Sequence, residues 1–223
     1  MAVRNWFVLV AILAGALGLA LDFYVIASVL TVSAQNPVAR SVPSFLIYSL
    51  TFLTNLSNIG LLLVYLSDWT KAPWLGWFRH PVTRAGMAGI MTLVMGFYHF
   101  MLAPNYHFTG PIVWSNILLH YVTSIMFLVW WVAFTRHGTL RYRDLPMMLV
   151  PGLAYVAYVL VRGVISGEYP YTILDPGFAI PGQAAQGYVG VAIGVAVLVI
   201  MVALFDLVLI AADGLLARRA QPA

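Results

Sequence analysis

One stretch decides the fold class of this sequence: residues 183–212 read QAAQGYVGVAIGVAVLVIMVALFDLVLIAA and carry a single charged side chain, that of Asp206. An α-helix rises about 1.5 Å per residue, so an apolar run of about 20 residues crosses the hydrocarbon core of a bilayer. The rest of the chain has the same character, because 62% of its 223 residues are hydrophobic and only 8% are charged. A soluble domain carries roughly a quarter charged residues. The composition therefore excludes a soluble protein and predicts a membrane bundle.

Six apolar runs of about this length follow one another along the chain. The predicted membrane spans cover residues 6–32, 43–67, 82–103, 112–135, 146–166 and 183–212. We therefore expect an all-α integral membrane protein, a single bundle of six transmembrane helices that takes in residues 1–223 as one domain. The first run is longer than the core of a secretory signal peptide and contains Asp22, so we interpret it as a retained helix. Residues 163–182, rich in Gly, Pro and aromatic side chains, are a candidate lid on the outer face.

The basic residues separate between the two sides of the predicted bundle. Arg40 and Arg162 lie towards one side, and the others share the opposite side: Arg4, Lys71, Arg79, Arg84, Arg136, Arg141, Arg143, Arg218 and Arg219. Cytoplasmic loops carry the excess of Lys and Arg, so this distribution predicts that both termini are cytoplasmic. In a bacterium the protein would lie in the inner membrane. The net charge of +4 arises from these rim residues, which excludes nucleic-acid binding.

Polar side chains inside the predicted spans indicate a functional layer, because an unpaired polar group costs several kcal/mol in a bilayer. Thr54 lies 14 residues before Asp68, and His120 lies 16 residues before Arg136. With the helical rise, these spacings place Thr54 about 21 Å and His120 about 24 Å from the cytoplasmic rim. Asp22 lies about 27 Å along the first helix by the same rule. The sequence therefore predicts a polar pocket in the outer half of the membrane.

Two interpretations of this polar layer stand side by side. Ser, Thr and Asn side chains in membrane helices commonly join helices through hydrogen bonds. In the catalytic interpretation, Thr54 is a nucleophile and His120 is the base that takes its proton. Donors for the oxyanion would come from the amides of Asn55, Asn58 and Asn116.

Asp22 and Asp206 are the acidic residues inside the predicted spans. Three roles suit Asp22: it orients the base, pairs with Arg162, or hydrogen-bonds to neighbouring hydroxyl groups. Asp206 is expected close to the cytoplasmic rim, where water solvates it. The pair of carboxylates that a glycosidase needs is absent.

Two further classes of function are compatible with the sequence. His99 and His120 lie on consecutive antiparallel helices and would suit axial ligation of a b-type haem. A small-molecule or lipid transporter, or a lipid-binding membrane protein without hydrolytic activity, is the other alternative, although the chain has no internal repeat. Because cysteine is absent, thiolate metal sites and a cysteine nucleophile are excluded.

Several short motifs occur in a distinctive order along the predicted helices. FLTNLSN, residues 52–58, contains Thr54, and SNILLHY, residues 115–121, contains Asn116 and His120. The motifs that follow are LRYRDLP (140–146), PGLAYVAYVLVRG (151–163) and GEYPYTILD (167–175). Over residues 43–175 this order resembles the FAR-17a/AIG-type (Pr6Pr) family, which includes bacterial six-span proteins and the animal androgen-induced and androgen-dependent proteins.

The resemblance implies a six-helix membrane hydrolase that cleaves lipid esters such as fatty acid esters of hydroxy fatty acids, with a threonine nucleophile and a histidine base. Carried over, these roles fall to Thr54 and His120. The LTF string of the animal proteins occurs here at Thr51, and Thr54 is preferred because it keeps the T-x-x-S-N spacing. The implied partners are membrane lipids and a lipid-like ester, and the chemistry needs no metal or other cofactor.

Four residues are candidates for contact with the substrate: Thr51, His99, Arg162 and Tyr171. Arg162 lies near the outer end of the fifth span, beside the YPY run that contains Tyr171. Its guanidinium would hold a substrate carboxylate, or alternatively it is a rim cation that snorkels to the interface.

Overall fold

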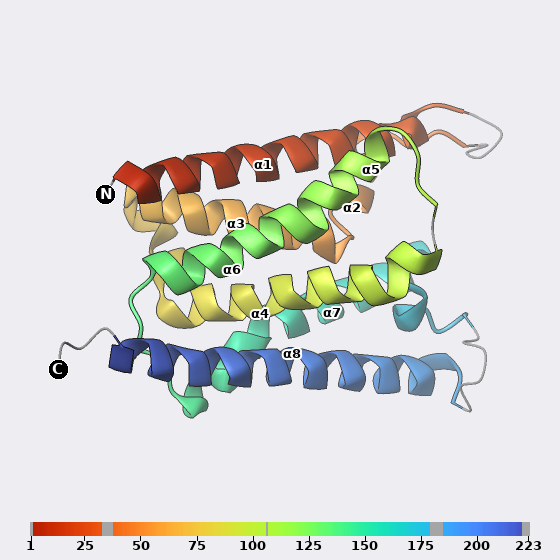
Figure 1. Ribbon diagram of the computed structural model, residues 1–223. Coiled ribbons are helices and arrows are strands. Elements are labelled where there is room, and N and C mark those ends of the chain that lie inside the picture. The colour runs from red at the N-terminus through yellow and green to blue at the C-terminus, as the bar shows by residue number, and fades with distance from the viewer. Residues whose placement is uncertain (1, 33–37, 106, 179–184, 220–223) are drawn as a thin grey trace.

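The chain folds into a bundle of roughly parallel and antiparallel helices (Figure 1). The computed structural model describes residues 2–32, 38–105, 107–178 and 185–219, and no strand occurs among them. Five helical segments are long and apolar enough to cross a membrane, or six if one bent pair counts as a single span. This architecture is that of a multi-pass membrane protein.

The five unbroken segments lie close to the positions that hydropathy predicts. They are α1 (Ala2–Ile26), α4 (Pro81–Phe97), α5 (Pro111–Asn116) with α6 (Thr123–Phe134), α7 (Leu145–Ser166) and α8 (Gly187–Arg219). A proline in the first turn starts α4, α5 and α7, because proline lacks the N–H that would be left without an acceptor there. Short 3-10 turns occupy Ala27–Leu30, Pro73–Arg79, Ala103–Asn105, Tyr142–Asp144 and Thr172–Leu174.

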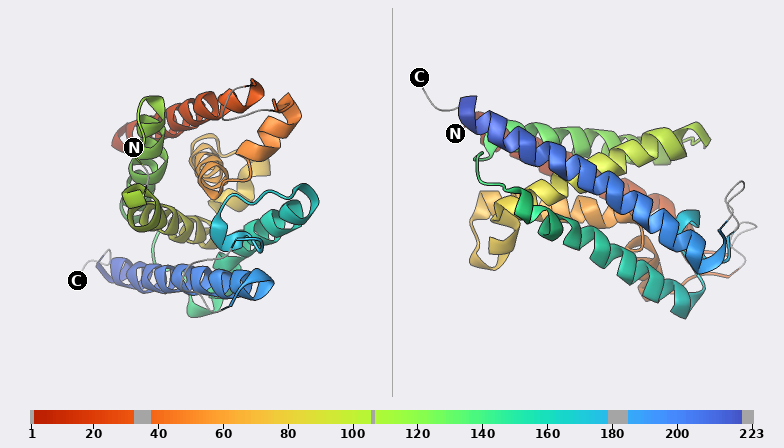
Figure 2. Two further views of the ribbon diagram at one scale, coloured as in Figure 1. Left: turned by 90° about the vertical axis from the view of Figure 1, so that its right-hand side faces the viewer. Right: turned by 90° about the horizontal axis from the view of Figure 1, so that it is seen from below.

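The second predicted span is broken, which corrects the expected continuous helix over residues 43–67. It consists of α2 (Val42–Ser49) and α3 (Leu53–Thr70), which meet at an angle of 81°. In the end-on view of Figure 2, α2 projects away from the bundle while α3 runs inside it. The break therefore places the beginning of α3 within the protein.

Side chains take up the backbone groups that this break frees. Asn55 Nδ2 donates to the carbonyl oxygen of Ser49 at 3.0 Å, and the Tyr155 hydroxyl donates to that of Thr51 at 2.9 Å. Buried carbonyl groups need such partners when no helix supplies them. Part of the polar run that hydropathy assigned to one continuous helix thus stabilises the bend between α2 and α3.

Two of the spans contain a π-helical segment. Residues Tyr98–Leu102 (η3) continue α4, and residues Ile117–Val122 (η5) join α5 to α6. Such segments are rare and frequently occur at functional sites. His120 lies in η5, so its direction is set by a local widening of the helix.

The central helix of the bundle is α4, which contacts α3, α6, α7 and α8. Glycines allow the close approach: the backbone of Met148 on α7 lies against Gly86, and the side chain of Asp206 on α8 lies against Gly89. Asp206 is completely buried, which corrects the expectation of a solvated position. The reason is that α8 continues to Arg219, well beyond the predicted end at residue 212.

The two ends of the bundle carry different ion pairs. The terminal end, which holds the start of α1 and the last turns of α8 (Figure 1), has Asp68 paired with Arg4, Lys71 and Arg84. At the opposite end, here called the loop end, Arg40 and Arg162 both pair with Glu168. Residues 179–184, which belong to the candidate lid and to the predicted start of the last span, lie outside the described residues.

Candidate functional site

Thr54 and His120 are in direct contact near the loop end. Thr54 is the second residue of α3, and its Oγ lies 3.1 Å from His120 Nε2. The other ring nitrogen, Nδ1, lies 3.1 Å from the carbonyl oxygen of Asn116. A carbonyl oxygen only accepts, so the proton of the neutral ring is on Nδ1. Nε2 therefore accepts a hydrogen bond from the Thr54 hydroxyl, which is the arrangement of a nucleophile beside its base.

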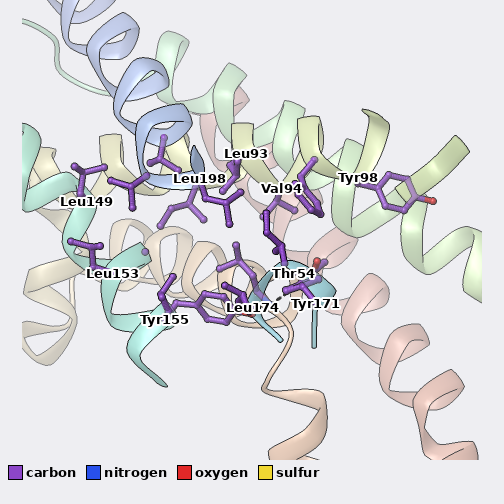
Figure 3. Close-up of a pocket in the computed structure, with 18 of the residues that line it drawn as sticks. Thr54, Leu93, Val94, Tyr98, Leu149, Leu153, Tyr155, Tyr171, Leu174 and Leu198 are labelled. Atoms are coloured by element: carbon purple, nitrogen blue, oxygen red, sulfur yellow. Dashed lines mark hydrogen bonds between the residues drawn. The ribbon is translucent and has the colours of Figure 1, made fainter. Parts of the chain in front are cut away.

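An apolar chamber begins at this pair (Figure 3). Its cavity volume is about 80 Å³, and its walls are mostly apolar side chains of α4, α7 and α8. Figure 3 shows Thr54 and Tyr171 at one end of the chamber and Leu149 and Leu153 at the other. The chamber has the apolar lining of a site for a hydrocarbon chain.

A second cavity, the vestibule, adjoins the chamber on the side of α1 and the loop end. Its cavity volume is about 270 Å³, and it is bordered by Asp22, Asn55 and Pro170 among others. Five residues line both spaces: Thr54, Tyr98, Leu102, His120 and Tyr171. The Thr54–His120 pair thus lies where an apolar space meets one that contains a carboxylate and an amide.

Asp22 joins three segments at the vestibule. Its carboxylate accepts from Asn55 Nδ2 at 2.9 Å and from Ser115 Oγ at 3.2 Å. Asp22 thus adopts one of its three expected roles, that of a hydrogen-bond partner, and its partners include a hydroxyl group. It connects α1 to the start of α3 and to α5, and so fixes the segments that carry Thr54 and His120.

The asparagine amides proposed as oxyanion donors have other partners. Besides the Asn55 bonds, Asn58 Nδ2 donates to the carbonyl oxygens of Thr54 at 2.8 Å and Leu119 at 3.0 Å. Asn58 therefore ties α3 to η5. Asn116 Nδ2 is buried and has no hydrogen-bond partner among the described residues.

Thr51 and Arg162 lie apart from the Thr54–His120 pair. The Thr51 hydroxyl donates to the carbonyl oxygen of Ile47 at 2.8 Å, within the bend between α2 and α3. Arg162 donates to the carbonyl oxygen and the carboxylate of Glu168 at 2.9 and 2.6 Å. Neither residue lines the chamber or the vestibule.

His99 is also separate from His120. Its ring is exposed, and Nδ1 lies 3.0 Å from the Tyr121 hydroxyl. His120 has both ring nitrogens engaged, by Thr54 and by the Asn116 carbonyl. The two imidazoles are therefore not arranged around a common space. Within the part of the chain that the structure describes, no group of three or more His, Asp and Glu side chains is placed to hold a metal ion.

Tyr171 reaches the site from the loop that follows α7. Its hydroxyl oxygen accepts a hydrogen bond from the backbone N–H of Leu53 at 3.2 Å. Burial raises the pKa of the Tyr171 phenol, and hydrogen bonding with Thr54 and Leu53 offsets part of that rise. The described part of the candidate lid thus places the phenol of Tyr171 at the first turn of α3.

Sequence reasoning did not identify Tyr98, Tyr155 or Ser115 as parts of this site. Ser115 lies next to Asn116 in the SNILLHY motif, and its position in the same motif as His120 was the signal that could have identified it. Tyr155 lies in the quoted run PGLAYVAYVLVRG and Tyr98 lies in no quoted motif. Neither could be assigned to the site, because their positions depend on how α4 and α7 pack around α3. No protein-family model, curated protein or solved structure matches this chain. The geometry and chemistry of the site therefore carry the functional argument.

Proposed function

We propose that this protein is a membrane hydrolase of lipid esters in which Thr54 is the nucleophile and His120 the general base. The observation that carries the proposal is the 3.1 Å contact between Thr54 Oγ and His120 Nε2, in the tautomer that leaves Nε2 free to take a proton. A threonine hydroxyl is inert at neutral pH without such a base. The contact joins residues 66 positions apart in the sequence, so it is a property of the fold.

The two cavities suit the two parts of an ester. The acyl chain lies in the apolar chamber among α4, α7 and α8, with its carbonyl carbon beside Thr54. The alcohol part lies in the vestibule near Asp22 and Asn55. Water enters by the same vestibule, because its lining is the more polar of the two.

The reaction takes two steps. His120 Nε2 removes the Thr54 proton while Oγ attacks the ester carbonyl, and the tetrahedral intermediate collapses as the protonated imidazole gives its proton to the departing alcohol. The product of this step is an acyl ester on Thr54. In the second step His120 takes a proton from water, which attacks the acyl ester. The fatty acid leaves and Thr54 Oγ regains its proton from the imidazole.

The proposal includes a topology and a family. The bent pair α2–α3 acts as one span, which gives six, and the terminal end with its basic residues faces the cytoplasm. The resemblance of residues 43–175 to FAR-17a/AIG-type proteins supports the same reaction and fatty acid esters of hydroxy fatty acids as substrates. The membrane supplies the substrate.

The test is ester hydrolysis by the purified protein in detergent, with fluorophosphonate labelling of the nucleophile. Thr54→Ala and His120→Ala should each lose at least about 100-fold in kcat, and labelling should map to Thr54. Thr51→Ala is the matched control, because the Thr51 hydroxyl bonds to the Ile47 carbonyl oxygen in the bend between α2 and α3 and does not line the chamber or the vestibule. Turnover that survives in Thr54→Ala would refute the mechanism. A wild-type protein that binds fatty acids in the chamber without hydrolysing any ester would instead be a lipid-binding or transport protein.

A further inference from the structure

Tyr171 lies at the proposed reaction centre, beside the first turn of α3. The phenol oxygen lies at the first turn of α3, where it accepts from the Leu53 N–H at 3.2 Å and interacts with the Thr54 side chain. Its ring is held edge-on by Phe52 and Phe97, with centroid distances of 6.3 and 6.2 Å. The residue lines both the chamber and the vestibule, so it borders the point where a scissile ester would lie.

The asparagine amides near Thr54 are poorly placed to stabilise the oxyanion. Asn55 and Asn58 each give their Nδ2 group to two acceptors that hold helices together. Asn116 lines neither the chamber nor the vestibule. A donor that borders Thr54 and both spaces is therefore needed, and the phenol of Tyr171 meets this description.

We propose that Tyr171 is a catalytic residue whose phenolic O–H donates a hydrogen bond to the oxyanion formed when Thr54 attacks an ester. This inference rests on the proposed hydrolase function. Oγ of Thr54 and the oxyanion are bonded to the same carbon in the tetrahedral intermediate, so a donor close to Oγ also reaches the oxyanion. No bond to Tyr171 is made or broken, and its proton stays on the phenol throughout.

The surroundings of the phenol strengthen it as a donor. The Leu53 N–H donates to the phenol oxygen, and hydrogen bonds in a chain polarise one another. The first turn of α3 also contributes the positive end of the helix dipole, which favours negative charge beside Thr54. A preorganised donor of this kind stabilises the transition state more than the ground state.

The loop after α7 consequently belongs to the catalytic centre. Gly163 allows the ring of Tyr169 to lie directly against α7, since a Cβ atom there would clash with that ring. Leu174, almost completely buried, anchors the other side of Tyr171 in a small cluster with Tyr155 and Val159. Two anchors thus hold Tyr171 in place.

The experiment compares oxoesters with matched thionoesters in wild type and in Tyr171→Phe. Sulfur is a poor hydrogen-bond acceptor, so a thionoester cannot use the phenol well. Loss of one oxyanion donor should lower kcat for the oxoester by about 10²–10³. The thionoester should lose less than about tenfold, since this donor contributes little to its reaction. Tyr169→Phe is the control, because it keeps the ring that packs against Gly163 and removes a hydroxyl from the same loop at a position that lines neither the chamber nor the vestibule.

The outcomes separate this inference from the proposed function. Equal losses on both ester types would mean that Tyr171 only supports the fold, and wild-type kinetics in Tyr171→Phe would mean that it has no role; either result overturns the inference. In both cases the hydrolase would stand, provided that Thr54 is still the labelled residue. Absence of hydrolysis in the wild-type protein, with no labelling of Thr54, would overturn both proposals.

Discussion

The ring of Tyr98 stacks on the imidazole of His120, with the ring centroids 3.9 Å apart and the planes inclined by 20°. Both residues lie in π-helical segments, η3 and η5, of neighbouring spans. The stacking covers one face of the imidazole, and the Asn116 carbonyl fixes its Nδ1. Together these contacts restrain the rotation that would carry Nε2 away from Thr54.

Removal of the stacked ring should impair catalysis more than binding. We expect Tyr98→Leu to lower kcat between about tenfold and 100-fold with little change in KM, because small displacements of a catalytic group have effects of this size. Tyr98→Phe keeps the ring and serves as the control, with kinetics close to wild type. Steady-state hydrolysis of one ester by the three proteins is the measurement. Equal losses in both variants would assign the effect to the hydroxyl and contradict the stacking argument.

The far end of the apolar chamber should set the preferred length of the acyl chain. Leu149 lies at the end away from Thr54 (Figure 3), and a tryptophan there would fill space that a long chain occupies. Leu149→Trp should lower kcat/KM for long acyl chains by roughly tenfold or more and leave short chains nearly unaffected. The measurement is a series of esters that differ only in chain length.

Val150→Trp is the matched control for the chamber, because Val150 is the next residue on α7 and its side chain is exposed. It should leave the chain-length preference as in wild type. A uniform loss across all chain lengths in Leu149→Trp would show that the chamber is not the acyl site.

The ion pairs at the loop end predict a defined pH dependence of stability. Hydrogen bonding from Arg40, and then from Arg162, holds the pKa of Glu168 below its ordinary value of 4.5, against the opposing effect of burial. A carboxyl group whose pKa is lower in the folded state than in the unfolded state stabilises the fold at pH values above the unfolded-state pKa. This contribution is lost as the pH falls through the folded-state pKa. Because Glu168 is partly exposed, solvent screening limits the contribution to at most about 1 kcal/mol.

The corresponding variant is Glu168→Gln, which keeps the shape and removes the charge. We expect a lower Tm than wild type at about pH 7, and a gap that closes as the pH falls well below 4.5, where wild-type Glu168 is also neutral. Thermal unfolding in a non-ionic detergent at several pH values measures this. A gap that persists or widens in acid would contradict the assignment.

The close contact between α4 and α8 should depend on a glycine, which has no side chain, at position 89. A Cβ atom at this position would clash with Asp206 Oδ1, and Asp206 is enclosed completely. Gly89→Ala should therefore cost about 1–3 kcal/mol in the free energy of unfolding. Gly96→Ala, on the same helix with no side chain or remote backbone atom within 4 Å, should be neutral or stabilising by up to about 1 kcal/mol.

The double variant Gly89→Ala with Asp206→Ala tests the cause. Asp206→Ala removes the carboxylate that would clash. Adding Gly89→Ala to Asp206→Ala should therefore lower the free energy of unfolding much less than Gly89→Ala does in the wild-type protein. Strict additivity of the two single effects in chemical unfolding would indicate that the contact is not the source of the loss.

The sequence alone determined the membrane architecture and the level of the candidate site. Hydropathy and helical rise are local properties, so they located the five unbroken spans and predicted that Thr54 and His120 lie level with each other; the structure has the two side chains in contact. The separation of basic residues also follows from the chain itself: Arg40 and Arg162 lie at the loop end, while Arg4 and Arg84 surround Asp68 at the terminal end.

Only the tertiary structure decided how the helices break and turn at the site. The bend between α2 and α3 depends on Tyr155 and Asn55, which reach the freed carbonyl groups from α7 and from the next turn of the chain. The burial of Asp206 depends on a glycine in α4, and the position of Tyr171 depends on a loop folding back onto α3. Periodicity contains no information on such contacts, because they arise from side chains packing across segments that are distant in sequence.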